Sequence, residues 1–173
     1  MKKTTKGFTL IELLIVISLL GALAVGLLAT VDPFEQLKKG TDTSIRNTTS
    51  ELYNSFIRYY AVKNAMPWTT DLTGMSASNV SMTGASTGYL NKVIDAGELK
   101  PEFIQLAGGG LDSIFVTSTA DVNGVRQNVS VCFLPGSKSF ANESNSKYAT
   151  DGGLDTGCKG TGGTAKTCYW CIK

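Results

Sequence analysis

A single carboxylate lies inside the most apolar part of this 173-residue chain. Between Phe8 and Val31 the sequence is FTLIELLIVISLLGALAVGLLATV, and Glu12 is its only charged residue. Ionisable side chains are rare in helices that cross a membrane, and they usually have a partner or a function there. We therefore expect Glu12 to have a partner or a function. The alternative is that its side chain only extends to the polar headgroups at the nearer membrane surface.

Four cysteines form a second group of reactive side chains: Cys132, Cys158, Cys168 and Cys171. They follow the apolar segment, on the side expected outside the cytosol, where an even number of cysteines indicates disulfides. Cys168 and Cys171 would face opposite sides of a strand, which disfavours a bond between them. Of the three pairings that four cysteines allow, we favour Cys158 with Cys168 and Cys132 with Cys171. The Cys-x-x-Cys spacing alternatively suggests a redox centre or half a zinc site, but redox motifs open a helix and zinc sites use a second cysteine pair.

The composition excludes several kinds of catalytic site. The chain has no histidine, so it lacks Ser-His-Asp and Cys-His catalysis and the HExxH zinc site. We therefore expect no enzyme activity. Three of the 16 basic residues, Lys2, Lys3 and Lys6, precede the apolar segment, which leaves 13 against 14 acidic residues in the rest of the chain. A charge of about −1 gives no electrostatic surface for nucleic acid.

The apolar segment is long enough to cross a membrane. Its 24 residues would form a helix of roughly 36 Å, and the hydrocarbon core of a bilayer is about 30 Å thick. The lysines before it predict a cytoplasmic N-terminus, because positive residues concentrate on the cytoplasmic side. We therefore expect a single-pass membrane protein whose remaining residues lie outside the cytoplasm.

A cleaved secretory signal peptide is the alternative interpretation of this segment. Ala22, Leu23 and Ala24 supply the small-residue pattern that signal peptidase recognises. Cleavage after Ala24 would release a secreted, disulfide-stabilised binding module. The apolar core of a signal peptide is normally about 7–15 residues long and ends near its cleavage site, so the uncleaved helix is favoured.

The residues around Glu12 resemble a known family. Lys6-Gly7-Phe8-Thr9-Leu10-Ile11-Glu12 is similar to the start of type IV prepilins and type II secretion pseudopilins. These carry a short basic leader, a glycine cut by a prepilin peptidase, an aromatic residue after it and a glutamate four residues further on. The resemblance implies cleavage between Gly7 and Phe8, methylation of the Phe8 amine, and a salt bridge from Glu12 to that amine on an adjacent subunit. Many members have a proline where this chain has Ala29; its first proline is Pro33.

The resemblance implies a structural role. The chain would be a subunit of a type IV pilus-like or pseudopilus filament, assembled from a membrane pool by bundling of the N-terminal helices after leader cleavage. Its partners would be further copies of itself, the prepilin peptidase and methyltransferase, the assembly machinery in the membrane, and lipid before assembly. The final location would be a filament at the cell surface or in the periplasm.

We expect the protein to need no cofactor. Calcium is the one candidate ligand. Residues 151–157 form a glycine-rich loop with two carboxylates, Asp151 and Asp155, and calcium prefers oxygen ligands. Major pseudopilins, which the chain resembles, bind calcium near their C-terminal sheet. The loop lacks the D-x-D-x-D-G arrangement of an EF-hand, and we favour a solvated turn.

The elements that position these residues begin with one long, interrupted helix. We expect a leader at 1–7, a membrane and filament-core helix at 8–31, and a second helical half at 32–64. Asp32-Pro33-Phe34-Glu35 predicts a new helix start, with Asp32 as N-cap and Pro33 in the first turn. One helix face would pack, and a polar face would include residues 38, 39, 42, 46, 51 and 58. The packing face is the apolar one and consists of Leu37, Ile45, Leu52, Phe56, Tyr59 and Tyr60.

The remaining residues, 65–173, predict a globular head. Residues 69–88 are rich in Ser and Thr and read as a surface loop. A short helix is expected from about Tyr89 to Ala96. Strands are expected at Asp112–Thr119 and Val125–Leu134, joined at Val122-Asn123-Gly124, and at Thr167–Lys173. In the second strand, residues 125, 127, 129, 131 and 133 share the face that would mostly point inward, and residues 126, 128, 130 and 132 share the other. The fold class is therefore α+β, with a long helix packed on a small antiparallel sheet whose C-terminal part the disulfides hold.

Overall fold

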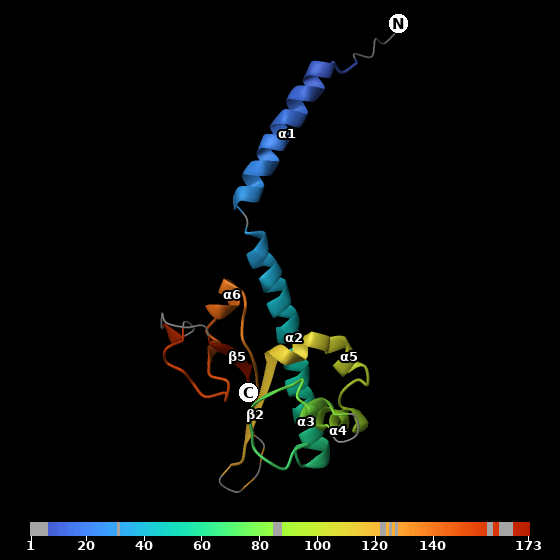
Figure 1. Cartoon of the computed structure of the whole chain (residues 1–173), viewed down its shortest axis with the longest axis vertical. Helices are drawn as coiled ribbons and strands as arrows, with labels where there is room; N and C mark the ends of the chain where they lie inside the picture. The colour runs from blue at the N-terminus through green and yellow to red at the C-terminus, as the bar shows by residue number, and fades with distance from the viewer. Residues whose placement is uncertain are drawn as a thin grey trace. The chain divides into compact units, whose positions relative to one another are not determined.

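The computed structural model describes residues 7–30, 32–84, 88–121, 124, 126, 128–158, 161–162 and 168–173. The chain divides into two compact units, Met1–Gln36 and Leu37–Lys173. Helix α1 (Leu10–Thr30) belongs to the first unit, and helix α2 (Pro33–Lys63) begins there and continues through the second (Figure 1).

The predicted helix start at Asp32 is confirmed. Its Oδ1 accepts hydrogen bonds from the backbone N–H groups of Phe34 at 3.1 Å and Glu35 at 3.2 Å, which is the N-cap arrangement. Pro33 is the first residue of α2, where it needs no hydrogen-bond donor. At its other end α2 stops at Lys63, and Asn64 follows with a φ of 52°, a conformation that asparagine tolerates better than most residues.

The head contains one five-stranded antiparallel sheet. The strands are β1 (Leu72–Ser76), β2 (Ile114–Thr119), β3 (Asn128–Phe133), β4 (Ser146–Tyr148) and β5 (Tyr169–Ile172), in the order β1-β2-β3-β5-β4. Strands β2 and β3 pair from Ile114 with Phe133 to Thr119 with Asn128, so the predicted antiparallel pair is confirmed. Its expected turn falls on Val122 and Asn123, which lie outside the described residues.

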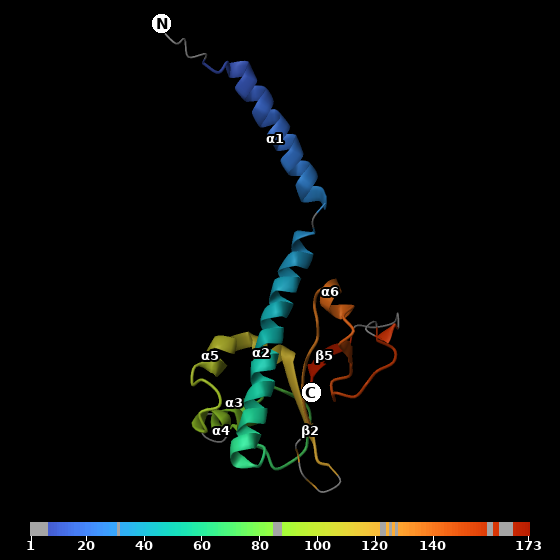
Figure 2. The ribbon, with the colours of Figure 1, turned by 180° about the vertical axis from the view of Figure 1, so that it is seen from behind.

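The sheet packs one face against α2. Leu52 and Phe56 of the helix and Val116, Val131 and Phe133 of the sheet are completely buried in one hydrophobic core. Figures 1 and 2 show β2, β5 and α6 (Lys138–Ala141) on one side of α2 and the short helices α4 (Tyr89–Asp95) and α5 (Phe103–Ala107) on the other. Val129, Val131 and Phe133, which were assigned to the inward face of the second strand, are buried. Cys132, which was assigned to the other face, is buried as well, because it forms a disulfide with Cys171. The fold is thus the expected α+β, pilin-like architecture.

The prediction that residues 69–88 form a surface loop is wrong. The segment contains β1, which pairs with β2 at the sheet edge, and a short helix α3 (Val80–Thr83). Leu72, Ala77 and Met82 are buried in the core. A few well-spaced apolar side chains therefore fix this segment, although nine of its 20 residues are Ser or Thr.

Several short elements complete the head. The helix predicted near Tyr89–Ala96 is α4 (Tyr89–Asp95), and Gly97 follows it with a φ of 80°. Helix α5 (Phe103–Ala107), the 3-10 helix η1 (Gly108–Ser113), α6 and β4 were not predicted. The last strand is shorter than predicted: β5 spans Tyr169–Ile172, and residue 167 of the prediction lies outside the described residues.

Two residues of α2 contradict the faces predicted from helical periodicity. Leu37 was expected to pack but is 68% exposed. Asp42 was assigned to the polar outer face but is only 3% exposed. Among the described residues, the hydrophobic contacts of α2 with the core begin at Ile45 and continue to Tyr60, so the packed face of the helix does not extend back to Leu37.

Candidate functional site

Helix α1 is apolar on every side. Its large apolar side chains are all exposed within the described structure, from 45% for Val16 to 82% for Leu10. The segment Leu10–Leu28 has a mean hydropathy of 2.6 and is long enough to cross a membrane. A helix of this kind needs an apolar environment outside its own subunit, which a bilayer or a bundle of identical helices provides.

Glu12 lies in the first turn of α1 and forms a capping box with Thr9. The backbone N–H and the hydroxyl of Thr9 both donate to Glu12 Oε2 at 2.8 Å. In return, the Glu12 backbone N–H donates to Thr9 Oγ1 at 3.3 Å. This reciprocal pattern satisfies N–H groups that have no partner at a helix start. The Thr-x-x-Glu spacing signals it in the sequence, but the sequence-based expectation considered only the charge of Glu12.

Gly7 and Phe8 precede the helix in an accessible segment. Phe8 is 81% exposed, and a Cβ placed on Gly7 would have no atom within 4 Å. The peptide bond between them is therefore open to an enzyme. The leader lysines at positions 2, 3 and 6 lie outside the described residues.

The two disulfides have the pairing favoured from the sequence. Cys132 and Cys171 are register partners on β3 and β5, with a Cα–Cα distance of 4.1 Å. Cys158 and Cys168 are joined across a separation of ten residues. All four cysteines are buried, and each is oxidised, which leaves no thiolate for redox or zinc chemistry in this state.

The two acidic residues of the 151–157 loop each fold back on their own backbone. Asp151 Oδ1 accepts a hydrogen bond from Gly153 N at 2.8 Å, and Asp155 Oδ1 accepts one from Gly157 N at 2.9 Å. Asp155 also lies within 4.8 Å of the sulfur atoms of Cys158 and Cys168, but a disulfide is not a thiolate ligand. Calcium binding by the two carboxylates stays a prediction.

The buried carboxylate of Asp42 organises the C-terminal part of the head. Its Oδ1 accepts from Gly136 N at 3.0 Å, and its Oδ2 accepts from Ser137 N at 2.8 Å and Ser137 Oγ at 2.6 Å. These contacts tie α2 to the segment that leads into α6, across a sequence separation of about 95 residues. No local pattern marks such a distant pair, which is why sequence reasoning missed it.

Arg46, one turn after Asp42, adds a second link to the same region. Its guanidinium carbon lies 5.1 Å from the ring centroid of Trp170 and 5.7 Å from that of Phe140. Arg46 Nη1 also lies 3.8 Å from Glu143 Oε1. Together, Asp42 and Arg46 hold β5 and α6 to the long helix, so this cluster has a structural role.

One catalytic pattern that the composition argument overlooked is present at residues 84–88, which read Gly-Ala-Ser-Thr-Gly. The G-x-S-x-G motif places its serine on a turn from a strand into a helix. Here Gly84 directly follows helix α3, and the three central residues lie outside the described structure. The chain also has no histidine to activate a serine. The pattern therefore lacks the context of a hydrolase site.

Comparison with known proteins identifies the N-terminal segment. Residues 2–28 match the family model of the prokaryotic N-terminal methylation motif. The match covers the leader, Gly7, Phe8, Glu12 and nearly all of α1. No curated protein and no solved structure gives a significant match to the chain. The chain thus carries the signal of type IV pilins and pseudopilins in front of a pilin-like α+β head.

Proposed function

We propose that the chain is a structural subunit of a type IV pilus-like or pseudopilus filament. The observation that supports this most directly is the methylation motif at residues 2–28, which coincides with a helix whose large apolar side chains are exposed in the part of the chain that the structure describes. Before assembly these side chains would contact lipid. In a filament they would contact the same helix of neighbouring copies. A structural role also agrees with the lack of a recognisable catalytic constellation in the sequence.

Processing of the N-terminus would prepare the subunit for assembly. A prepilin peptidase would cut between Gly7 and Phe8, and methylation of the new Phe8 amine would follow. The amine keeps its positive charge, and in an apolar bundle it would be the natural partner for Glu12 of an adjacent subunit. An unpaired carboxylate would be unfavourable in such a bundle. The uncut precursor has no amine at this position and would be unable to assemble correctly.

The proposed topology places the N-terminus in the cytoplasm and the head outside it. The two disulfides support an oxidising environment for the head. The partners would be identical subunits, the processing enzyme and the assembly machinery in the membrane. No cofactor is needed for this role, and Asp151 and Asp155 remain candidate calcium ligands only.

N-terminal sequencing and intact mass of the mature chain test the proposal. We expect a chain that begins with N-methylated Phe8. A chain that begins with Met1 would contradict processing, and one that begins with Val25 would favour the secreted binding module. Gly7→Val gives a matched control, because the structure has open space around a Cβ at this position. This variant should keep the head folded while cleavage is blocked.

A further inference from the structure

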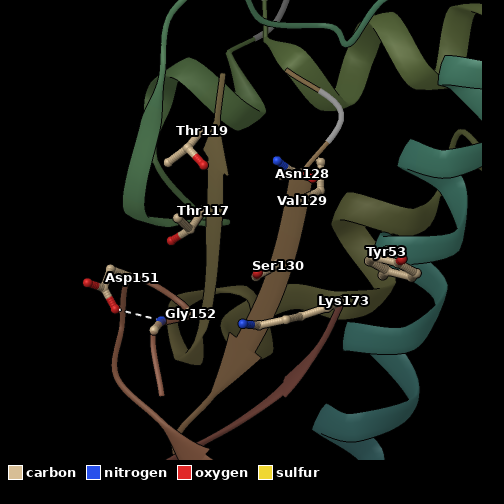
Figure 3. Close-up of a pocket in the computed structure, with 10 residues that line it drawn as sticks. Tyr53, Thr117, Thr119, Asn128, Val129, Ser130, Asp151, Gly152 and Lys173 are labelled. Atoms are coloured by element: carbon tan, nitrogen blue, oxygen red, sulfur yellow. Dashed lines mark hydrogen bonds between the residues drawn. The ribbon is translucent and has the colours of Figure 1, made fainter. Parts of the chain in front are cut away.

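The head contains a polar cavity of about 530 Å³ that the filament proposal does not use. Its lining includes Thr119 of β2 and Asn128 and Ser130 of β3. Tyr53 of α2 lines it as well, and so do Asp151 and Lys173 near the C-terminus. Figure 3 shows Thr119, Asn128, Ser130 and the Lys173 ammonium group around the same space as the Asp151–Gly152 turn. The volume lies within the usual range of about 300–1,000 Å³ for small-molecule sites.

The wall of this cavity is formed before any ligand binds. Thr117 Oγ1 accepts a hydrogen bond from Gly74 N at 2.8 Å and donates one to Thr150 O at 3.1 Å, which fixes the turn against the sheet. Gly152 is buried, with a φ of 73°, and a Cβ on it would lie only 2.8 Å from Ser130 Oγ. The turn therefore needs glycine to approach β3 this closely. A preformed wall reduces the ordering cost of binding.

The chemistry of the lining favours an uncharged ligand with many hydroxyl groups. Thr119 and Ser130 offer hydroxyls, and Asn128 offers both a donor and an acceptor. The two charged groups, Asp151 and Lys173, have opposite signs. A strongly charged ligand would thus meet one group of its own sign. An apolar ligand would leave polar groups without water or a partner, which is costly.

We propose that this cavity binds a neutral sugar unit. Sugar hydroxyls donate and accept at once, so they match the mixed donors and acceptors of Thr119, Asn128 and Ser130. The inference does not rest on filament formation, because every lining residue belongs to the compact unit Leu37–Lys173.

Saturation-transfer NMR tests the proposal on the full chain in phosphatidylcholine nanodiscs. Nanodiscs avoid glycoside detergents, which would compete for the cavity. The probes are the methyl glycosides of glucose, galactose and N-acetylglucosamine, with glucuronate and glucosamine as charged counterparts. We expect saturable binding of at least one neutral glycoside, and weaker binding of the two charged sugars.

Variants then locate the binding site. Thr119→Val and Asn128→Ala each remove polar atoms from exposed cavity residues, and each should weaken binding about tenfold, as expected for one lost hydrogen bond. Thr70→Val and Asn142→Ala are matched changes at exposed positions outside the cavity, and binding should stay within about twofold of the unmodified chain. Circular dichroism confirms that each variant is folded. Absence of binding by all neutral glycosides, binding of the charged sugars alone, or equal loss in cavity and control variants would each overturn the proposal.

Discussion

Replacement of Asp42 by alanine should destabilise the head more than any other single change on the polar side of α2. The carboxylate accepts three hydrogen bonds from the segment before α6, and it is only 3% exposed. Ser137, which supplies two of the donors, is 1% exposed, so water does not replace the lost acceptor easily. Gly136 is exposed, and its N–H can bind solvent instead.

The expected size follows from these contacts. A hydrogen bond to a charged group contributes about 1.5–3 kcal/mol, and a buried donor left without a partner costs about 1–3 kcal/mol. The Ser137 hydroxyl can rotate toward another acceptor, so only its N–H is fully orphaned. We expect Asp42→Ala to lower the free energy of unfolding by about 2–4 kcal/mol. For a head of this size, that corresponds to a fall of roughly 6–15 °C in Tm.

Thermal unfolding of residues 32–173, followed by far-UV circular dichroism, measures this effect. Asp42→Asn keeps one carbonyl oxygen as an acceptor and should lose roughly half as much stability as Asp42→Ala. Thr43→Ala, at the exposed neighbouring position, is the control and should change the free energy by less than about 0.5 kcal/mol. A Tm for Asp42→Ala within about 1 °C of the unmodified fragment would refute the reasoning that buried contacts of this carboxylate hold the C-terminal region to α2.

Four further predictions concern assembly and the head. Glu12→Gln should leave membrane insertion intact and abolish or slow filament formation, as seen by membrane fractionation and electron microscopy; normal filaments would mean that the charge is not needed. Thr9→Val should weaken the helix start but preserve the charge, so filaments should still form, at a reduced rate. Residues 32–173 should be a soluble monomer in gel filtration, and stable filaments of this fragment would contradict a role for α1 in assembly. Reduction of the disulfides should increase hydrogen exchange in the C-terminal strands and leave α2 largely protected.

Local signals explain the parts of the structure that the sequence predicts well. The apolar segment, the Gly7-Phe8 bond and Glu12 lie within a few residues of each other, and so do Asp32 and Pro33 at the start of α2. The alternation of apolar residues in β3 is also a short-range pattern. In each case the interacting residues are close in sequence, so composition and spacing are sufficient.

The missed features depend on distant contacts or on weak local patterns. The role of Asp42 as a hydrogen-bond acceptor depends on Ser137, which is 95 residues away. No sequence pattern near either residue indicates the contact. Strand β1 lies in a segment rich in Ser and Thr, where the apolar Leu72 gives no periodic pattern. The strand is stabilised by its pairing with β2, which the local composition does not indicate. Strand β4 has only three residues, too few for a periodic pattern. The capping box of Thr9 and Glu12 is different. Its Thr-x-x-Glu spacing is visible in the sequence, but it was not interpreted as a helix cap.

That capping box changes how the charge of Glu12 should be understood. In the single subunit the carboxylate already has partners, since Thr9 donates two hydrogen bonds to it. Its presence in an apolar segment therefore does not by itself require a second chain. However, glutamine serves the same position of a capping box, so capping alone does not explain why the residue is acidic. The charge becomes necessary only if a positive group approaches, and cleavage after Gly7 would create one at Phe8. Under the proposed function, Thr9 would hold the carboxylate at the helix start until an adjacent amine replaced the local donors, and the negative charge would favour that exchange.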